Sequence, residues 1–184
     1  GDVGGDVGGD VGGDAGGEGG EGGEGGETLD LVSGVGTINF TNLKPDRKQI
    51  MDTDGNPAAE SAWAQLYAGA SPDSLSAAGS PVAFWTGSKA GYFSAGVVDV
   101  GFISEGYFQV KAWQSADTYE LASIRGGSNI FKMTPGNGVA SPPDLPTEMA
   151  SLESFSMTTL SVGGDVAGDP SGGGDPSGGG DPSG

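Results

Sequence analysis

The sequence predicts an all-β fold, an antiparallel β-sandwich of the immunoglobulin-like or jelly-roll-like type, flanked by repetitive tails rich in Gly, Asp and Glu. Turn signals such as Asp54-Gly55-Asn56-Pro57 recur at short intervals along the middle of the chain. Runs of β-branched and aromatic residues lie between these turns. No stretch has the apolar periodicity of an amphipathic helix. We therefore expect about eight short strands and no long helix.

The clearest strand is expected at residues 105–113, where Phe108, Val110 and Ala112 alternate with Gln109 and Lys111. Strict alternation of this kind is typical of an antiparallel strand with one buried face. A helical turn is considered at 58–62 or 72–78, and a loop or hairpin is expected at 125–128. The other strands are expected at residues 37–43, 62–68, 81–86, 91–94, 96–100, 129–133 and 152–159.

The chain divides into three parts of different composition. Residues 1–27 contain 15 Gly, eight acids and no base, and residues 161–184 contain ten Gly, four Asp and no base. Residues 28–160 hold all 14 aromatic residues and all seven Lys and Arg, and their net charge is −6 against −18 for the whole chain. This middle part has the composition of one globular domain.

The two tails repeat with short periods. The N-terminal tail has a period of four up to Gly16 and then a period of three that ends at Glu27, and the C-terminal tail has a period of six from Asp169. Such segments bury too little apolar surface to offset chain entropy, so we expect flexible, self-repelling, solvated spacers. Weak gathering of Ca²⁺ by the carboxylates and bundling of threefold extended helices are the alternatives.

The composition excludes several functional classes. The chain has no His and no Cys, so it lacks the residues of a Ser-His triad, a Cys nucleophile, a thiolate or imidazole metal site and a disulfide. Its acidity argues against nucleic acid and anionic membranes as partners, and no apolar run is long enough for a membrane span. A glycosidase pair drawn from the acids would need a fixed separation that their spacing does not indicate. We therefore expect no enzyme and no resident cofactor; the acids considered are Asp99, Glu105, Asp117 and Glu120.

One weak metal site is considered at Asp52 and Asp54. The run Asp52-Thr53-Asp54-Gly55-Asn56 resembles the start of a calcium loop, but an EF-hand needs Gly at position six and Glu at position twelve. Those positions hold Pro57 and Trp63. A turn between strands is the main expectation, with loosely held surface Ca²⁺ as the alternative.

The three Trp residues are the candidate ligand-binding residues. Trp63, Trp85 and Trp113 all fall on or beside predicted strands, and exposed Trp rings on one sheet face form the platform of many carbohydrate-binding sandwiches. Buried core positions are the main expectation, because Trp is mostly buried in proteins. Exposure of these rings on one flat face would favour the sugar-binding alternative.

Several short runs together resemble a known kind of domain. They are Ala64-Gln65-Leu66-Tyr67-Ala68-Gly69, Thr86-Gly87, Ala90-Gly91-Tyr92-Phe93, Phe108-Gln109-Val110-Lys111-Ala112-Trp113, Ser128-Asn129-Ile130-Phe131 and Leu152-Glu153-Ser154-Phe155. As a set they resemble a β-sandwich domain of uncharacterised secreted bacterial proteins of verrucomicrobial and planctomycete-like genomes, often found beside a PEP-CTERM sorting tail. The resemblance implies export and a surface or matrix role, and it supplies no catalytic residues. No apolar span and basic end follow Leu160 here, which departs from the sorting-tail pattern.

Together these observations predict an exported, non-enzymatic structural or interaction module at the bacterial cell surface or outside the cell. Its expected partners are other copies of itself, in a matrix or filament, or other surface and matrix proteins. In the filament version, residues 28–40 and 152–160 are the expected donor strands for a neighbouring subunit. The alternative is a carbohydrate-binding module that holds a polysaccharide on exposed Trp residues.

Overall fold

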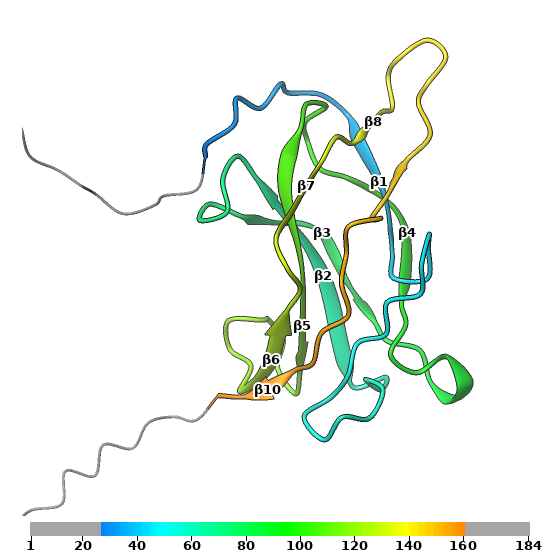
Figure 1. Ribbon diagram of the computed structural model, residues 1–184, viewed down its shortest axis with the longest axis vertical. Coiled ribbons are helices and arrows are strands. Elements are labelled where there is room, and N and C mark those ends of the chain that lie inside the picture. The colour runs from blue at the N-terminus through cyan, green and yellow to red at the C-terminus, as the bar shows by residue number, and fades with distance from the viewer. Residues whose placement is uncertain (1–26, 161–184) are drawn as a thin grey trace, which may run out of the picture.

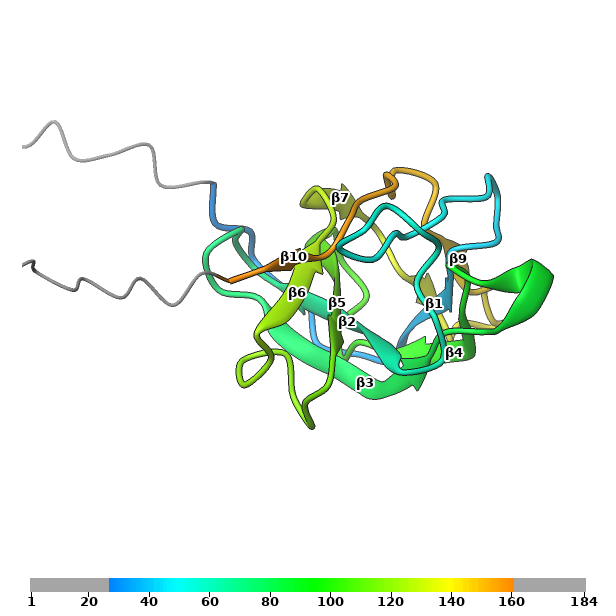
Figure 2. The same ribbon diagram turned by 90° about the horizontal axis from the view of Figure 1, so that it is seen from below.

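The computed structural model describes residues 27–160, which form two β-sheets packed face to face (Figure 1). The predicted all-β sandwich is therefore confirmed. In Figure 2 the strands β1 (Gly36–Thr41), β4 (Ser94–Asp99) and β9 (Thr147–Glu148) gather on one side. The strands β2 (Ala62–Gly69), β5 (Gly106–Gln114) and β6 (Ile124–Gly127) gather on the other. The two tails, for which the sequence predicts solvated spacers, lie outside the described residues.

The larger sheet has six strands around a long central pair. β2 (Ala62–Gly69) and β5 (Gly106–Gln114) run antiparallel in an unbroken register from Ala62 opposite Gln114 to Gly69 opposite Tyr107. β3 pairs with the outer edge of β2, β6 and β7 pair with different ends of β5, and β10 pairs with β6. The bounds of these strands are β3 (Ser76–Ala83), β6 (Ile124–Gly127), β7 (Phe131–Met133) and β10 (Thr158–Thr159).

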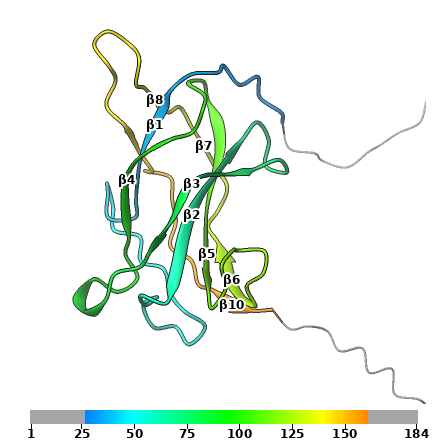
Figure 3. The ribbon, with the colours of Figure 1, turned by 180° about the vertical axis from the view of Figure 1, so that it is seen from behind.

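The smaller sheet is built around β1 (Gly36–Thr41), which lies between β4 and β8 and also pairs with β9. The β1–β9 pairing is parallel, whereas the other ladders among the described strands are antiparallel. Figure 3, from behind, shows β3 next to β4, where the two sheets approach at one edge. The remaining bounds are β4 (Ser94–Asp99), β8 (Gly136–Asn137) and β9 (Thr147–Glu148).

The proposed donor strands both pair within their own chain. β1 falls in the expected segment 28–40 and is a central strand of the smaller sheet, and β10 falls in 152–160 and is paired with β6. Withdrawing β1 would break three ladders at once. In the single chain these segments complete the domain's own sheets, and their donation to a neighbouring subunit stays a prediction.

The core is an aromatic cluster between the sheets. Phe93 lies 4.7 Å from Phe40 and 5.5 Å from Phe84 between ring centroids, and Phe108 packs against Phe102 and Phe131. On β2 and β5 the buried positions alternate, as the sequence predicts, so every second side chain enters this core. The intervening side chains lie on the outer face of the larger sheet.

One buried polar side chain ties the core loops together. The Asn42 side chain is fully buried, and its Nδ2 donates to the carbonyl oxygens of Lys48 and Gly91 at 2.8 and 2.9 Å. Its Oδ1 accepts from the Phe93 N–H at 2.8 Å. These bonds satisfy the amide and hold segments distant in sequence against the end of β1.

Several predicted elements differ from the structure. The segment considered for a helical turn at 72–78 contains the start of β3, and the strand expected at 81–86 ends at Ala83. Residues 91–93 form no strand and only Ser94 belongs to β4; within residues 27–160 the one short helix is the 3₁₀ turn η1 (Gly87–Lys89). Residues 125–128, expected as a loop or hairpin, lie largely within β6.

The missed strands are poor in β-forming side chains. β3 is mostly Ala, Ser and Gly, which have little preference for strands. Pairing with β2 stabilises it as a strand instead. β6 contains Gly126, where an added Cβ would lie 2.6 Å from the Ser156 carbonyl oxygen. Glycine is therefore required there by close approach of another backbone. Among residues 27–160, no helix has the length and apolar character needed to cross a membrane.

Candidate functional site

Trp63 is the exposed aromatic residue on the outer face of the larger sheet. Its neighbours Ala62 and Ala64 are fully buried, so the period-two geometry of β2 directs the indole outward. The side chain is 39% exposed. Across β3 it faces the small Ala83, and across β5 it faces Trp113.

Trp113 lies in the same row but is only 1% exposed. The chain turns back directly after β5, with Ser115 in the left-handed region at φ 62°. The Trp113 Nε1–H then donates to the Ala116 carbonyl oxygen at 3.0 Å, and Tyr119 packs edge-on against the indole at 6.3 Å. The loop at residues 115–123 thus covers Trp113, which is a positioning residue rather than a ligand platform.

The same loop builds one wall of a hollow over Trp63. The hollow has a volume of about 220 Å³ and is lined by Trp63, Pro81, Ala116 and Asp117. Pro81 belongs to the irregular part of β3, where the β2–β3 register shifts between Ala64 and Leu66. The bulge and the loop therefore bring Pro81, Ala116 and Asp117 around an exposed indole.

Beside the hollow, the loop is fixed to the sheet by a polar and aromatic cluster. The Tyr67 hydroxyl donates to Glu120 Oε1 at 3.1 Å, and Arg125 Nη1 donates to the carbonyl oxygens of Tyr119 and Glu120, both at 2.9 Å. Lys111 Nζ lies 3.9 Å from the centroid of the Tyr67 ring and 4.8 Å from that of Tyr119. These contacts hold the loop that forms the wall of the hollow.

The titration of this cluster reflects its burial. Desolvation, followed by the nearby Glu120 charge and the hydrogen bond to Glu120, raises the pKa of Tyr67 to about 12. Desolvation also raises the pKa of Tyr119 and lowers the pKa of Lys111. A hydrogen bond from its own backbone is the main influence that lowers the pKa of Glu120. The Tyr67 hydroxyl is therefore a donor at neutral pH, and Glu120 is its ionised acceptor.

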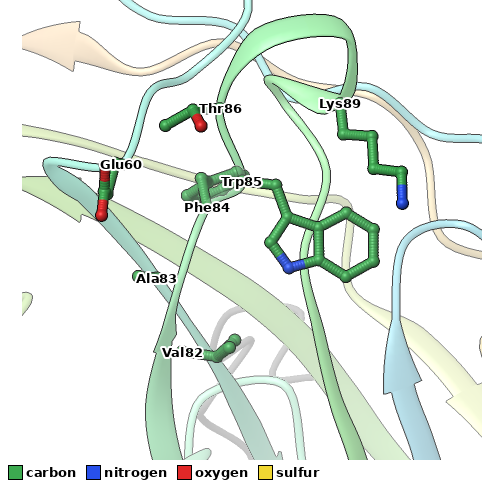
Figure 4. A pocket seen from close by; sticks show the side chains of 7 residues that line it. All are labelled: Glu60, Val82, Ala83, Phe84, Trp85, Thr86 and Lys89. Atoms are coloured by element: carbon green, nitrogen blue, oxygen red, sulfur yellow. The ribbon is translucent and has the colours of Figure 1, made fainter.

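Trp85 lines a different hollow, of about 530 Å³ (Figure 4). Figure 4 shows the Trp85 ring and Lys89 on one side of the chain and Glu60 and Thr86 on the other. Lys89 Nζ lies 4.9 Å from the indole centroid, so one face of this half-buried ring already has a partner. The two hollows share no lining residue. The structure therefore does not bring the three Trp rings onto one open platform.

Asp52 and Asp54 form a turn closed on itself. Asp52 Oδ1 accepts the N–H groups of Asp54 and Asn56 at 2.9 and 2.8 Å, as in an Asx turn. In residues 27–160, no group of three or more Asp or Glu side chains is placed to hold a metal ion. The geometry thus fits the hairpin interpretation and offers Ca²⁺ at most two carboxylates at this turn.

Sequence reasoning singled out Trp63 but not the residues that enclose it. Asp117 was considered only as half of a glycosidase pair. Asp99, another of the acids considered for that pair, lies in the smaller sheet. Its Oδ1 accepts hydrogen bonds from the N–H groups of Gly36 and Gly101. Pro81 and Ala116 carry no sequence signal for a site, because a bulge and a left-handed turn bring them to Trp63.

No protein-family model, curated protein or solved structure matches the chain, so the resemblance to secreted bacterial β-sandwich domains stays a prediction.

Proposed function

We propose that this protein is an interaction module that binds a neutral polysaccharide, with one sugar residue stacked on Trp63. The observation that carries the proposal is the exposed Trp63 indole in a hollow that Asp117 also lines. Exposing much of a large aromatic ring costs hydrophobic free energy, so an open Trp in a concave site favours a binding role.

The chemistry of the hollow suits a sugar ring. The apolar face of a pyranose packs against the flat indole, and Pro81 adds a second apolar surface beside it. The Asp117 carboxylate accepts hydrogen bonds from ring hydroxyls, and charge-assisted bonds of this kind are the stronger ones. One aromatic surface and a single charged acceptor give both affinity and orientation.

The size and charge of the hollow limit the kinds of ligand that it can hold. A volume of 220 Å³ is below the roughly 300–1,000 Å³ typical of small-molecule pockets, so the hollow fits one sugar residue of a longer chain. No cationic side chain lines it, and Asp117 would repel a uronate or a sulfate. A neutral polysaccharide is therefore favoured over an anionic one. The predicted location outside the cell or at the cell surface would place such a module in contact with these polymers.

Affinity electrophoresis in gels containing soluble neutral polysaccharides, such as mixed-linkage glucan, xylan and galactomannan, tests the proposal. We expect retardation by at least one of them, lost in Trp63→Ala and weakened in Asp117→Asn. Removing an aromatic anchor usually costs more than about 2 kcal/mol, or more than tenfold in Kd.

The matched control is Trp85→Ala, which removes the same side chain from the other hollow and is expected to leave retardation unchanged. A gel containing alginate, an anionic polysaccharide, is expected to retard none of the variants. Migration in all three neutral gels identical to that in a polysaccharide-free gel would overturn the proposal, as would retardation that survives Trp63→Ala.

A further inference from the structure

The outer face of the larger sheet gathers positive charge in an acidic protein. Lys111 on β5, Arg125 on β6 and Lys132 on β7 are three of the seven basic residues of the chain. Arg125 is opposite Trp113 in the β5–β6 ladder and Lys132 is opposite Tyr107 in the β5–β7 ladder, so all three share one face with Lys111. We call these three residues the basic strip.

Each member of the basic strip lies against an aromatic ring. Lys132 Nζ is 5.0 Å from the centroid of Tyr107, and the Arg125 guanidinium carbon is 4.9 Å from that of Tyr119. Within residues 27–160, neither Lys111 nor Arg125 forms an ion pair with a carboxylate. These two cations are held in place by rings and backbone carbonyls. Desolvation lowers the pKa of Lys111, and the charge of nearby Glu120 opposes this shift without forming an ion pair.

Lys132 has an acidic partner, and that partner is the last residue of the N-terminal repeat. Lys132 Nζ lies 2.8 Å from Glu27 Oε2. The Leu29 N–H donates to the Ala70 carbonyl oxygen at 2.7 Å and holds this part of the chain against the end of β2. Figure 1 shows the first described residues beside this end of the larger sheet. The repeat therefore joins the domain at one end of the basic strip.

The repeat is long enough to run the length of the strip. Glu24, Glu21 and Glu18 precede Glu27 at intervals of three residues, or about 9 Å in an extended threefold chain. Along β5, Lys111 is about 14 Å from the row of Lys132, and the row of Arg125 is about 20 Å from it, at about 3.4 Å per residue. Two steps bring Glu21 close to the row of Arg125, whereas Glu24 falls about 5 Å short of the row of Lys111, a gap that the long Glu and Lys side chains would have to span. The Gly residues between them let the backbone approach the rings.

We propose that residues 17–26 dock along the outer face of the larger sheet of their own chain, with Glu24 and Glu21 paired to Lys111 and Arg125. The Glu27–Lys132 contact begins the docking and sets its direction from β7 towards β6. Tethering at that contact favours the chain's own repeat over that of a second copy, because the effective concentration of a short tether is millimolar. The basic strip shares the outer face of the larger sheet with Trp63, but none of its three residues lines the Trp63 hollow.

A spin label tests the docking on the full chain. The sequence has no Cys, so Gly20→Cys provides a unique labelling site. We expect the label to broaden the amide signals of Lys111 and Arg125 at low salt, and to leave those of Val97 and Val35 on the smaller sheet unaffected. The broadening should fall at least about twofold near 1 M salt, where the Debye length is about 3 Å.

Charge variants of the tail test whether the broadening depends on the Glu side chains or only on the nearness of the tethered label. In the labelled chain, the triple variant E18Q/E21Q/E24Q is expected to lose the broadening at Lys111 and Arg125. The matched control D2N/D6N/D10N removes the same charge from the other repeat and is expected to keep it. Neither variant alters the folded domain, so both outcomes are decisive.

Broadening confined to the neighbourhood of Lys132, or equal in both triple variants, would overturn the proposal. A mixture of spin-labelled chains with isotope-labelled, label-free chains distinguishes the second-copy case. Broadening in the isotope-labelled chains of that mixture would show docking between copies and would overturn docking within one chain.

Discussion

Trp63 and Trp113 are direct partners across the β2–β5 ladder, yet the first is 39% exposed and the second 1%. The difference arises after the strand rather than in it. The left-handed Ser115 turns the chain back, and the Trp113 Nε1–H holds it through the Ala116 carbonyl oxygen. The Trp113 indole thus anchors the loop, and the loop forms one wall of the hollow at Trp63.

The first prediction concerns that anchor. Trp113→Phe keeps an aromatic ring but removes the donor to Ala116, so we expect a loss of about 1–2 kcal/mol in the free energy of unfolding. Amide exchange in residues 115–123 should accelerate, and polysaccharide retardation should weaken. Urea denaturation and hydrogen exchange measure both effects. The control Trp63→Phe is expected to change stability by less than about 0.5 kcal/mol; unchanged loop exchange in Trp113→Phe would contradict the anchoring role.

The second prediction uses two adjacent glycines of β6. In Gly126→Ala the new Cβ would lie 2.6 Å from the Ser156 backbone oxygen, whereas in Gly127→Ala it would meet the Gln109 amide nitrogen at 2.8 Å. The Ser156 backbone cannot move away as easily as the Gln109 side-chain amide can. We expect Gly126→Ala to cost about 1–3 kcal/mol and to detach β10, and Gly127→Ala to cost clearly less. Thermal denaturation measures the difference; equal losses would contradict the close approach of β10.

The third prediction concerns the alkaline limit of the fold. Burial and Glu120 raise the pKa of Tyr67 from its usual 10.0 to about 12. Because the folded pKa lies above the unfolded one, this contribution to stability is complete below pH 10 and is lost as pH rises through about 12. An ultraviolet titration of the wild type, with Tyr67→Phe subtracted, should show this late step.

Glu120→Gln provides the control for that titration. It removes the charge that opposes phenolate formation, so the pKa of Tyr67 should fall but stay above its usual value, since burial is the largest cause of the shift. A Tyr67 titration at the ordinary position in the wild type would show that the loop does not cover this hydroxyl in solution.

The central strands β2 and β5 were predictable because apolar and polar side chains alternate along them. On β5, Phe108 and Val110 alternate with Gln109 and Lys111, and the structure buries the first pair in the core. β3 and β6 were not predictable in this way, because their Ala, Ser and Gly residues have little strand preference of their own. Their pairing depends on neighbours that are distant in sequence.

The candidate site was predictable only as a set of residue types. The sequence indicates three Trp residues near strands, but their exposure depends on what covers each one. Trp113 is covered by its own loop, Trp85 shares a hollow with Lys89, and Trp63 faces the small Ala83. The role of Asp117 depends on the turn at Ser115, which no local pattern indicates.

By itself, the sequence determined the fold class, the division into an acidic repeat on each side of one domain, and the absence of His and Cys chemistry. These follow from composition and from alternation between neighbours along the chain. Only the tertiary structure decided that Trp63 is exposed, that Asp117 lines the same hollow, and that Glu27 contacts Lys132. Contacts between residues far apart in the chain depend on register and loop direction, and the pairing of whole strands sets both.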